Sequence, residues 1–370
     1  MQEWFGGAVS FRLRLLSLVW VVTASRCKCA AQNECSKTGL GFLMKQKRLF
    51  SGIQPTGELH LGNYFGAIMN WVRLQDQWDA IYCVVDYHAM TVEYDSDTMR
   101  RRVLEVSALL IACGLDPAKC SLFVQSDVPE HTELMWVLST LAPMGRLQNM
   151  TQFKEKSEKN ADNINLGLFA YPVLQAADIL IYKAEAVPVG EDQLQHLELS
   201  RELARKFNTR FGETFPEPKQ LMTEAPRILG LDGKSKMSKS LNNYIGLTET
   251  PAQVWEKLRP AYTDPARLRK SDPGNPDICN IFTLHKMVSP KELVLEIDHA
   301  CRKAEIGCIE CKRHLAQNLN TVLDPIRSRY SELEARPGEV LDVLAAAKER
   351  CRRMARETVH EVREKTGLRP

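Results

Sequence analysis

Two short segments that stand far apart in the sequence carry residues suited to binding phosphate groups. The first, His60-Leu-Gly-Asn63, follows a break at Pro55 and Gly57 and opens a helical pattern. Free amides and the positive end of a helix bind anions, and histidine and asparagine add neutral donors. The second, Lys236-Met-Ser-Lys-Ser240, places two lysines three positions apart in a serine-rich loop. Alone, each segment also fits an ordinary turn or a solvated loop. The presence of both in one chain is a stronger indication of a phosphate-binding site than either segment alone.

One carboxylate, Asp178, stands on a helical and mostly apolar segment, directly after Ala176 and Ala177. A carboxylate buried there without a partner would be costly, so a partner must exist. The partner is either a cation of the protein, in a structural salt bridge, or a hydrogen-bond donor of a ligand in a pocket.

Four of the eleven cysteines fall within a short stretch near the C-terminus, with the spacing C-x21-C-x6-C-x2-C. Four thiolates that include one C-x2-C pair suit tetrahedral zinc or a [4Fe–4S] cluster, and His314 is a reserve ligand for zinc. Separately buried cysteines are the alternative. The candidate ligands are Cys279, Cys301, Cys308 and Cys311.

The elements that must position these residues alternate between strands and helices. Continuous apolar runs at 80–85 and 121–125 are typical of buried parallel strands, and helical patterns at 99–113 and 131–141 separate them. We expect 187–189 to be the last strand of the sheet. The pattern predicts an α/β fold with a doubly wound parallel sheet, in which ligands bind at the carboxyl ends of the strands.

The pattern changes after Ser240 and is helical from Pro251 onward, with Pro337-Gly338 dividing the last two helices. We therefore predict a Rossmann-like domain at 47–245 and an all-helical domain at 246–370. The final helix is rich in basic side chains, which either contact phosphates or form a solvated face. These are Lys348, Arg350, Arg352, Arg353 and Arg356.

Composition limits the remaining possibilities. With 370 residues, of which 44% are hydrophobic, the chain can bury a large core and form two domains. A net charge of +3 means that contact with a nucleic acid must come from local basic clusters. The scattered cysteines favour a reducing compartment. No apolar run approaches the roughly 20 residues that span a bilayer, so we expect no membrane association.

The two segments together resemble the signature motifs of class I aminoacyl-tRNA synthetases. His60–Asn63 is similar to the "HIGH" motif in its H-x-G-N form, and Lys236–Ser240 matches "KMSKS" at all five positions. Three wider strings, 52–55, 171–178 and 187–193, resemble the tryptophanyl-tRNA synthetase family in particular. The resemblance runs from about residue 47 to near the C-terminus.

The resemblance implies that tryptophan is activated with ATP and Mg²⁺ and then passed to the 2′-hydroxyl of the terminal adenosine of tRNA(Trp). Such a reaction needs alignment and charge stabilisation rather than an acid or a base. The implied catalytic residues are His60, Asn63, Lys154, Lys236 and Lys239. The implied ATP-binding residues are Gln54, His60, Leu61, Gly62, Asn63, Gly190, Glu191, Asp192, Gln193, Ile228, Lys236, Met237, Ser238, Lys239 and Ser240.

By the same resemblance, Asp178 is the acceptor for the indole N–H of tryptophan. The other implied tryptophan-binding residues are Phe50, Gly52, Gln54, His88, Tyr171, Gln175, Val187 and Val189. Tyrosyl-tRNA synthetases use a similar helix, so a tyrosine–tRNA ligase is the alternative enzyme. The third possibility is a non-catalytic tRNA-binding relative. Such relatives usually lose lysines of the Lys-Met-Ser-Lys-Ser loop, whereas this chain retains Lys236 and Lys239.

The resemblance also bears on assembly, metal and location. It implies that the helical domain binds the anticodon and that the protein is a homodimer. A subset of the family carries an iron–sulfur cluster on cysteines with nearly this spacing, which favours [4Fe–4S] over zinc for the four cysteines. Residues 1–46 are rich in arginine and poor in acidic residues, as in a transit peptide. We expect them to be a targeting leader to the mitochondrial matrix, with a plastid as the alternative.

Overall fold

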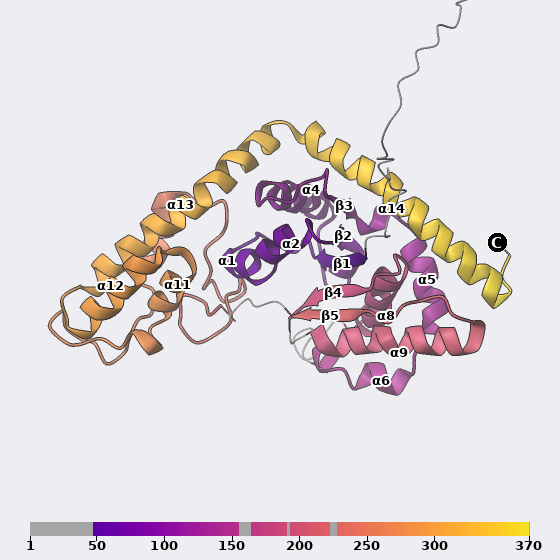
Figure 1. The fold of residues 1–370 in the computed structure, drawn as a ribbon, viewed down its shortest axis with the longest axis horizontal. Coiled ribbons are helices and arrows are strands. Elements are labelled where there is room, and N and C mark those ends of the chain that lie inside the picture. Colours follow the sequence, from indigo (N-terminus) through magenta and orange to yellow (C-terminus); the bar gives the residue numbers. More distant parts are fainter. Residues whose placement is uncertain (1–46, 155–163, 191–192, 223–227, 370) are drawn as a thin grey trace, which may run out of the picture. The chain divides into compact units, whose positions relative to one another are not determined.

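The computed structural model describes residues 47–154, 164–190, 193–222 and 228–369, all within one compact unit, Lys45–Pro370. The expected leader at 1–46 lies outside the described residues. A five-stranded sheet forms the centre of the described part (Figure 1). Its strands are β1 (Arg48–Ile53), β2 (Asp79–Val84), β3 (Cys120–Val124), β4 (Ala186–Val189) and β5 (Lys219–Met222).

The strands pair in the order β3-β2-β1-β4-β5, and every pairing is parallel. The predicted α/β fold with a doubly wound sheet is confirmed. One detail of the prediction is wrong: β4 is not the last strand, because β5 pairs with it in the register Val187↔Gln220. The sequence Lys219-Gln-Leu-Met222 lacks a continuous apolar run because β5 is a half-exposed edge strand.

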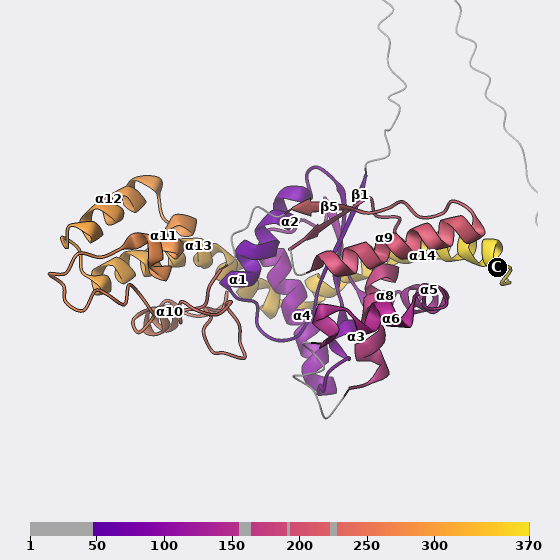
Figure 2. The same cartoon turned by 90° about the horizontal axis from the view of Figure 1, so that it is seen from below.

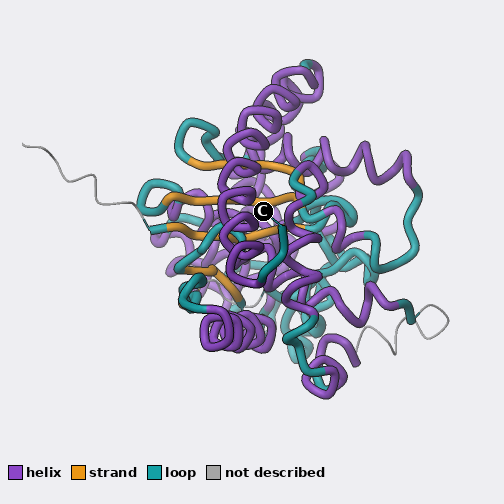
Figure 3. Tube along the Cα trace, turned by 90° about the vertical axis from the view of Figure 1, so that its right-hand side faces the viewer, coloured by secondary structure: helices purple, strands orange, loops and turns teal. Residues whose placement is uncertain are grey.

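Helices connect the strands and cover both faces of the sheet (Figure 3). A helical stretch after β1 runs through α1, a π-helical turn at Tyr64–Ile68, and α2. The helices up to β5 are α1 (Leu61–Asn63), α2 (Met69–Leu74), α3 (Asp86–Ala89), α4 (Ser96–Ala112), α5 (Glu130–Ser139), α6 (Met144–Gln148), α8 (Leu166–Leu180) and α9 (Leu194–Phe211). The later ones are α10 (Pro251–Leu258), α11 (Asn280–Val288), α12 (Lys291–Arg302), α13 (Cys308–Ala335) and α14 (Pro337–Thr366). Short 3₁₀ turns span Gln125–Asp127 and Pro276–Ile278.

The period of two along each strand assigns its side chains to two different cores. Leu49 and Tyr82 point to one face, where they pack with residues of α2 and α4. Phe50 and Ile81, their neighbours in sequence, point to the other face and pack with α5, α8, α9 and α14. Both faces of the sheet are therefore covered, which explains why β2 and β3 consist almost entirely of buried apolar residues.

The C-terminal part of the described chain is helical, as predicted. Figure 2 shows α10 to α13 grouped beside α1, and α13 packs on α4. The last helix, α14, returns to the sheet and packs against β3 and α5. No helix in the described ranges is long and apolar enough to cross a membrane.

The carboxyl ends of four strands lead to polar residues or glycine. His60 follows β1, His88 follows β2, Gln125 follows β3, and Gly190 follows β4. Because the strands are parallel, these ends lie along one edge of the sheet, where ligands bind in folds of this kind.

Candidate active site

The first segment is held in shape by its own side chains. His60 is the N-cap of α1: its Nδ1 accepts a hydrogen bond from the Gly62 amide, at 3.1 Å. The Asn63 side chain in turn accepts one from the His60 amide, also at 3.1 Å. A Cβ at Gly62 would lie 2.8 Å from the His60 ring, so only glycine allows this arrangement. The π-helical turn directly after Asn63 is a feature often found at functional sites.

The second segment is attached to the first through the backbone. The residues after Ser240 form an antiparallel bridge between His60 and Gly246. Leu61 donates to the Ile245 carbonyl and Leu247 donates to the Leu59 carbonyl, both at 3.0 Å. These bonds join two segments that are far apart in the sequence, and they fix the lysine loop beside the mouth of α1.

The two segments line one cavity of about 380 Å³. From the first come His60 and Asn63, and from the second come Ser238, Lys239 and Ser240. The Lys239 ammonium lies against Gly57, whose φ of +100° and missing side chain make room for it. The Glu58 carboxylate also lines this cavity and accepts a hydrogen bond from the Tyr244 hydroxyl at 3.1 Å. Lys239, His60 and Asn63 are the groups in the cavity suited to an anion.

The environment of His60 keeps its imidazole neutral. Burial, together with the charges of Lys239 and Lys236, lowers the pKa of His60 to about 4. Since Nδ1 accepts the bond from Gly62, the neutral ring carries its proton on Nε2. His60 is therefore a neutral donor at neutral pH, with its Nε2 proton available to a ligand.

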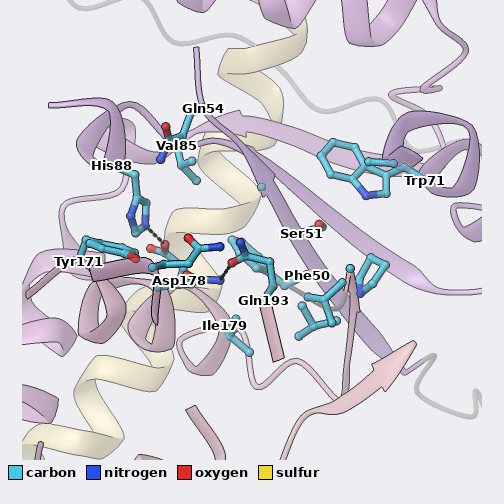
Figure 4. Close-up of a pocket in the computed structure, with 18 of the residues that line it drawn as sticks. Phe50, Ser51, Gln54, Trp71, Val85, His88, Tyr171, Asp178, Ile179 and Gln193 are labelled. Atoms are coloured by element: carbon cyan, nitrogen blue, oxygen red, sulfur yellow. Dashed lines mark hydrogen bonds and ion pairs between the residues drawn. The ribbon is translucent and has the colours of Figure 1, made fainter. Parts of the chain in front are cut away.

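A second cavity, of about 330 Å³, lies at the same edge of the sheet (Figure 4). Gln54 lines both cavities and so joins them. All the residues predicted to bind tryptophan line this second cavity: Phe50, Gly52, Gln54, His88, Tyr171, Gln175, Asp178, Val187 and Val189.

Asp178 is 1% exposed and accepts hydrogen bonds from three side chains. His88 Nε2 lies 2.7 Å from its Oδ2, while Gln125 Nε2 and His131 Nδ1 both lie 2.7 Å from its Oδ1. Sequence analysis missed Gln125 and His131. The sequence held little signal for them, because Gln125 opens the polar turn Gln125–Asp127 and His131 lies in the polar first turn of α5.

Asp178 is ionised in this setting. Burial opposes ionisation, but the hydrogen bonds and charges of His131 and His88 outweigh it and lower the pKa of Asp178 to about 2. The carboxylate is thus an acceptor at physiological pH, and it faces a cavity that also contains the apolar side chains of Phe50, Val187 and Val189.

Other predicted residues lie outside the two cavities or around them. Leu61, Ile228 and Met237 are buried in the core beneath the lysine loop. Lys154 and Lys236 line neither cavity; Lys154 Nζ lies 3.4 Å from Asn149 Oδ1. Gly190 and Gln193 line the cavity of Asp178, and Gln175 donates to Gln193. Glu191 and Asp192 lie outside the described residues.

The four candidate cysteines come together around a small, mostly apolar cavity between α11, α12 and the start of α13. Pro276, Ile281, Phe282 and Ile297 contribute to its walls, and Arg267 lies beside it. Even so, no group of three or more histidine, cysteine or acidic side chains in the described ranges is arranged to hold a metal ion. The cysteines that line the cavity are Cys279, Cys301, Cys308 and Cys311.

Comparison with known proteins agrees with this geometry. A family model described as "tRNA synthetases class I (W and Y)" matches residues 44–324. The fold and the two signature segments define the chain as a class I aminoacyl-tRNA synthetase of this group. A tryptophan–tRNA ligase of Deinococcus radiodurans is 50% identical over 326 residues, covering 87% of this chain and 98% of the relative.

Solved structures agree as well. The tryptophanyl-tRNA synthetase of Campylobacter jejuni, complexed with ADP and tryptophan, superposes with a TM-score of 0.81 at 35% identity and covers 87% of this chain and 100% of its own. A tyrosyl-tRNA synthetase of Archaeoglobus fulgidus, at 22% identity, TM-score 0.61 and coverage of 77% and 90%, shares the fold alone. The chain belongs to the tryptophanyl-tRNA synthetase family.

Proposed function

We propose that this chain is a tryptophan–tRNA ligase. It activates tryptophan with ATP to give tryptophanyl-adenylate and pyrophosphate, and then transfers the tryptophanyl group to the 2′-hydroxyl of the terminal adenosine of tRNA(Trp). The observation that carries the proposal is the pair of joined cavities. One presents Lys239 and neutral donors, the other presents an ionised carboxylate among apolar walls, and Gln54 links them.

Asp178 is suited to the indole of tryptophan, because an indole N–H only donates and an ionised carboxylate accepts. A phenol O–H can donate to the same carboxylate, and the second N–H of the Gln125 amide can donate to the phenol oxygen, so this cluster alone does not separate tryptophan from tyrosine. The choice of tryptophan is supported by the relatives: the Deinococcus radiodurans protein is a tryptophan–tRNA ligase, and the Campylobacter jejuni enzyme is complexed with tryptophan.

The ATP cavity supports alignment and charge stabilisation. We assign Lys239 and Lys236 to the phosphates, with Lys154 as a further cation, and His60 and Asn63 to the neutral contacts around the nucleotide. As the tryptophan carboxylate attacks the α-phosphate, negative charge develops on the departing pyrophosphate, and the nearby ammonium groups stabilise it. Mg²⁺ associates with phosphate oxygens and would add to this stabilisation when it enters with ATP.

ATP–pyrophosphate exchange tests the proposal. We expect exchange that depends on tryptophan, with tyrosine at least about 10²-fold less effective. A second assay, charging of a tRNA(Trp) transcript, tests the transfer step. Preferential exchange with tyrosine would assign the tyrosine ligase instead, and the absence of exchange with either amino acid would favour the non-catalytic relative.

We further propose that the four cysteines hold a metal centre that braces the helical region. The support is charge. Arg267 is 9% exposed and Lys312 is 5% exposed, and neither forms an ion pair with a carboxylate in the described part of the chain. Arg267 Nη1 lies 3.5 Å from Cys301 Sγ, and Lys312 lies near three of the cysteines. Backbone carbonyls accept hydrogen bonds from both cations but carry no net charge. Metal-bound thiolates would supply the negative charge that these buried cations lack.

The choice between a cluster and a single ion rests on the family resemblance, because four thiolates that include one C-x2-C pair suit either tetrahedral zinc or a [4Fe–4S] cluster. We therefore assign an iron–sulfur cluster of the [4Fe–4S] type, as in a subset of the family.

Anaerobic purification followed by an optical spectrum and by iron, sulfide and zinc analysis tests this assignment. We expect iron and labile sulfide in the wild type and in Cys113→Ala, and neither in Cys311→Ala. Zinc without iron would assign the zinc site, and a colourless protein with neither metal would remove the proposal.

We propose three parts for the chain: a leader at 1–46 that directs it to the mitochondrial matrix, a Rossmann-like domain at 47–245, and an anticodon-binding helical domain at 246–370.

We also propose that the protein is a homodimer. Large exposed apolar side chains support a partner surface: Trp136 on α5 is 74% exposed and Leu166 on α8 is 78% exposed. Sedimentation equilibrium should give about twice the monomer mass.

A reporter fused to residues 1–46 tests the location. We expect it to collect in mitochondria; collection in plastids would assign the alternative, and a diffuse signal would remove the proposed leader.

A further inference from the structure

The acceptor positions of Asp178 are unevenly occupied. A carboxylate offers about four acceptor positions, two on each oxygen. Oδ1 already accepts from Gln125 and His131, each at 2.7 Å. Within the described part of the chain, Oδ2 accepts from His88 alone, also at 2.7 Å. The open position is therefore on Oδ2, the oxygen beside His88, which itself lines the cavity.

His131 reaches Asp178 from the side away from the ligand. It is 0% exposed and does not line the cavity, although its Nδ1 bonds the carboxylate that does. Its second nitrogen, Nε2, lies 2.7 Å from the hydroxyl of Tyr182, another fully buried residue. His131 is also packed against the Tyr182 ring, with ring centroids 5.3 Å apart, and against Phe123 at 5.9 Å.

The direction of the hydrogen bond between His131 and Asp178 follows from chemistry. An ionised carboxylate only accepts, so His131 Nδ1 carries a proton and donates it to Asp178 Oδ1. Burial raises the pKa of Tyr182 well above its ordinary value, so its hydroxyl stays protonated and remains a hydrogen-bond partner of His131 Nε2. The imidazole is therefore held at both nitrogens, between Tyr182 and Asp178.

We propose that His131, oriented by Tyr182, is a positioning residue for recognition of tryptophan. By occupying Oδ1, it holds the Asp178 carboxylate in the rotamer that presents Oδ2 to the indole N–H. This inference rests on the proposed function, because it assigns Asp178 as the acceptor for tryptophan.

The location of His131 explains why the fold can hold it firmly. It is the second residue of α5, and its neighbour Glu130 accepts hydrogen bonds from Arg352 at 3.3 Å and Arg356 at 3.0 Å, both on α14. The first turn of α5 is thus bonded to the C-terminal helix, and the imidazole is bonded at both of its nitrogens. A side chain with so many fixed contacts can keep its neighbour within a narrow range of orientations.

A tryptophan analogue that lacks the N–H separates positioning from simple structural support. In β-(3-benzothienyl)alanine a sulfur atom replaces the indole nitrogen and its proton, so the bond to Asp178 Oδ2 is lost while the shape is nearly kept. Steady-state ATP–pyrophosphate exchange then gives KM for tryptophan, for the analogue and for ATP in each variant.

We expect His131→Leu to raise KM for tryptophan by about tenfold or more, to leave KM for ATP within about twofold, and to leave KM for the analogue nearly unchanged. His131→Asn keeps an N–H donor near the position of Nδ1 and should restore most of the tryptophan affinity. Tyr182→Phe should shift KM for tryptophan in the same direction by a smaller factor.

Ser107→Ala is the matched control. It also removes one buried hydroxyl, whose bond runs to the Val103 carbonyl at 2.7 Å within α4, away from the tryptophan cavity. It should lower stability without changing the discrimination between tryptophan and the analogue. If His131→Leu fails to fold, Tyr182→Phe decides the question against this control.

Equal losses of affinity for tryptophan and for the analogue, or no loss for either, would overturn the positioning role while leaving the proposed function intact. A wild-type protein without tryptophan-dependent exchange would overturn both together.

Discussion

At the scale of the residue, the protonation state of His60 depends on its neighbours. Burial and the two lysines lower the pKa of His60 to about 4, from about 6.5 in the unfolded chain. Between these two values the unfolded chain binds more protons than the folded one. The folded state is therefore favoured above pH 6.5, and this stability is lost as the pH falls toward 4.

His60→Asn tests this linkage. Asparagine can also accept from the Gly62 amide but does not titrate, so the variant should lose less stability than the wild type between pH 6.5 and 4. Urea unfolding at several pH values measures the difference. Identical slopes of stability against pH in the two proteins would show that His60 titrates normally.

Asp178 gives a second prediction at this scale. Asparagine offers one acceptor oxygen where the carboxylate offers two, so an amide group would face one of the donors His88, Gln125 and His131. We expect Asp178→Asn to raise KM for tryptophan by about tenfold or more and to lower stability by about 1–3 kcal/mol. Exchange kinetics and urea unfolding measure the two effects. An unchanged KM for tryptophan would mean that the indole N–H is recognised elsewhere.

At the scale of the element, the ion pairs of α14 show what the sequence could and could not predict. The basic residues of this helix were expected to contact phosphates or solvent. In the structure, Arg350 pairs with Asp79 at 2.5 Å, and Arg352 and Arg356 share Glu130. Both carboxylates stand more than two hundred residues earlier in the chain, and a helical pattern does not reveal which distant element a helix packs against.

The contacts between α14 and α5 are open to a stability test. Glu130 is 9% exposed, and hydrogen bonds from Arg356 and Arg352 help to lower its pKa against the opposing effect of burial. Arg352→Ala with Arg356→Ala leaves this carboxylate buried without cations, so we expect a loss of about 1–3 kcal/mol in the free energy of unfolding. Adding Glu130→Gln to this double variant should recover part of the lost free energy of unfolding. No recovery would show that the buried Glu130 carboxylate is not the cause of the loss.

The sheet was predicted where its strands are buried on both faces and was missed at its edge. Continuous apolar runs identified β2 and β3 because helices cover both of their faces. The polar strand β5 gave no such signal. The same limit applies to the site: the residues of the tryptophan cavity could be carried over from family motifs, but Gln125 and His131 belong to no motif and were found only through their contacts with Asp178.

At the scale of the whole molecule, α14 belongs to the folding core of the sheet. Its buried residues Cys351, Met354, Ala355, Val359 and Val362 lie in the same apolar cluster as Phe123 and Ile81. A chain that ends at residue 336 would expose this face, so we expect it to aggregate, whereas a chain that ends at Gly367 should behave as the full chain does. Size-exclusion chromatography of the two truncations compares them directly, and a monodisperse, folded short form would contradict this role for α14.

The central claim is that two segments about 175 residues apart act on one ATP molecule. Single and double substitutions at His60 and Lys239, assayed by tryptophan-dependent ATP–pyrophosphate exchange, test it most directly. Each of His60→Ala and Lys239→Ala should lower the rate by about 10²-fold with little change in KM for tryptophan. The double variant should depart from additivity by at least about 0.5 kcal/mol, because both groups contact the same nucleotide. Unimpaired exchange in Lys239→Ala, or strict additivity in the double variant, would contradict the claim.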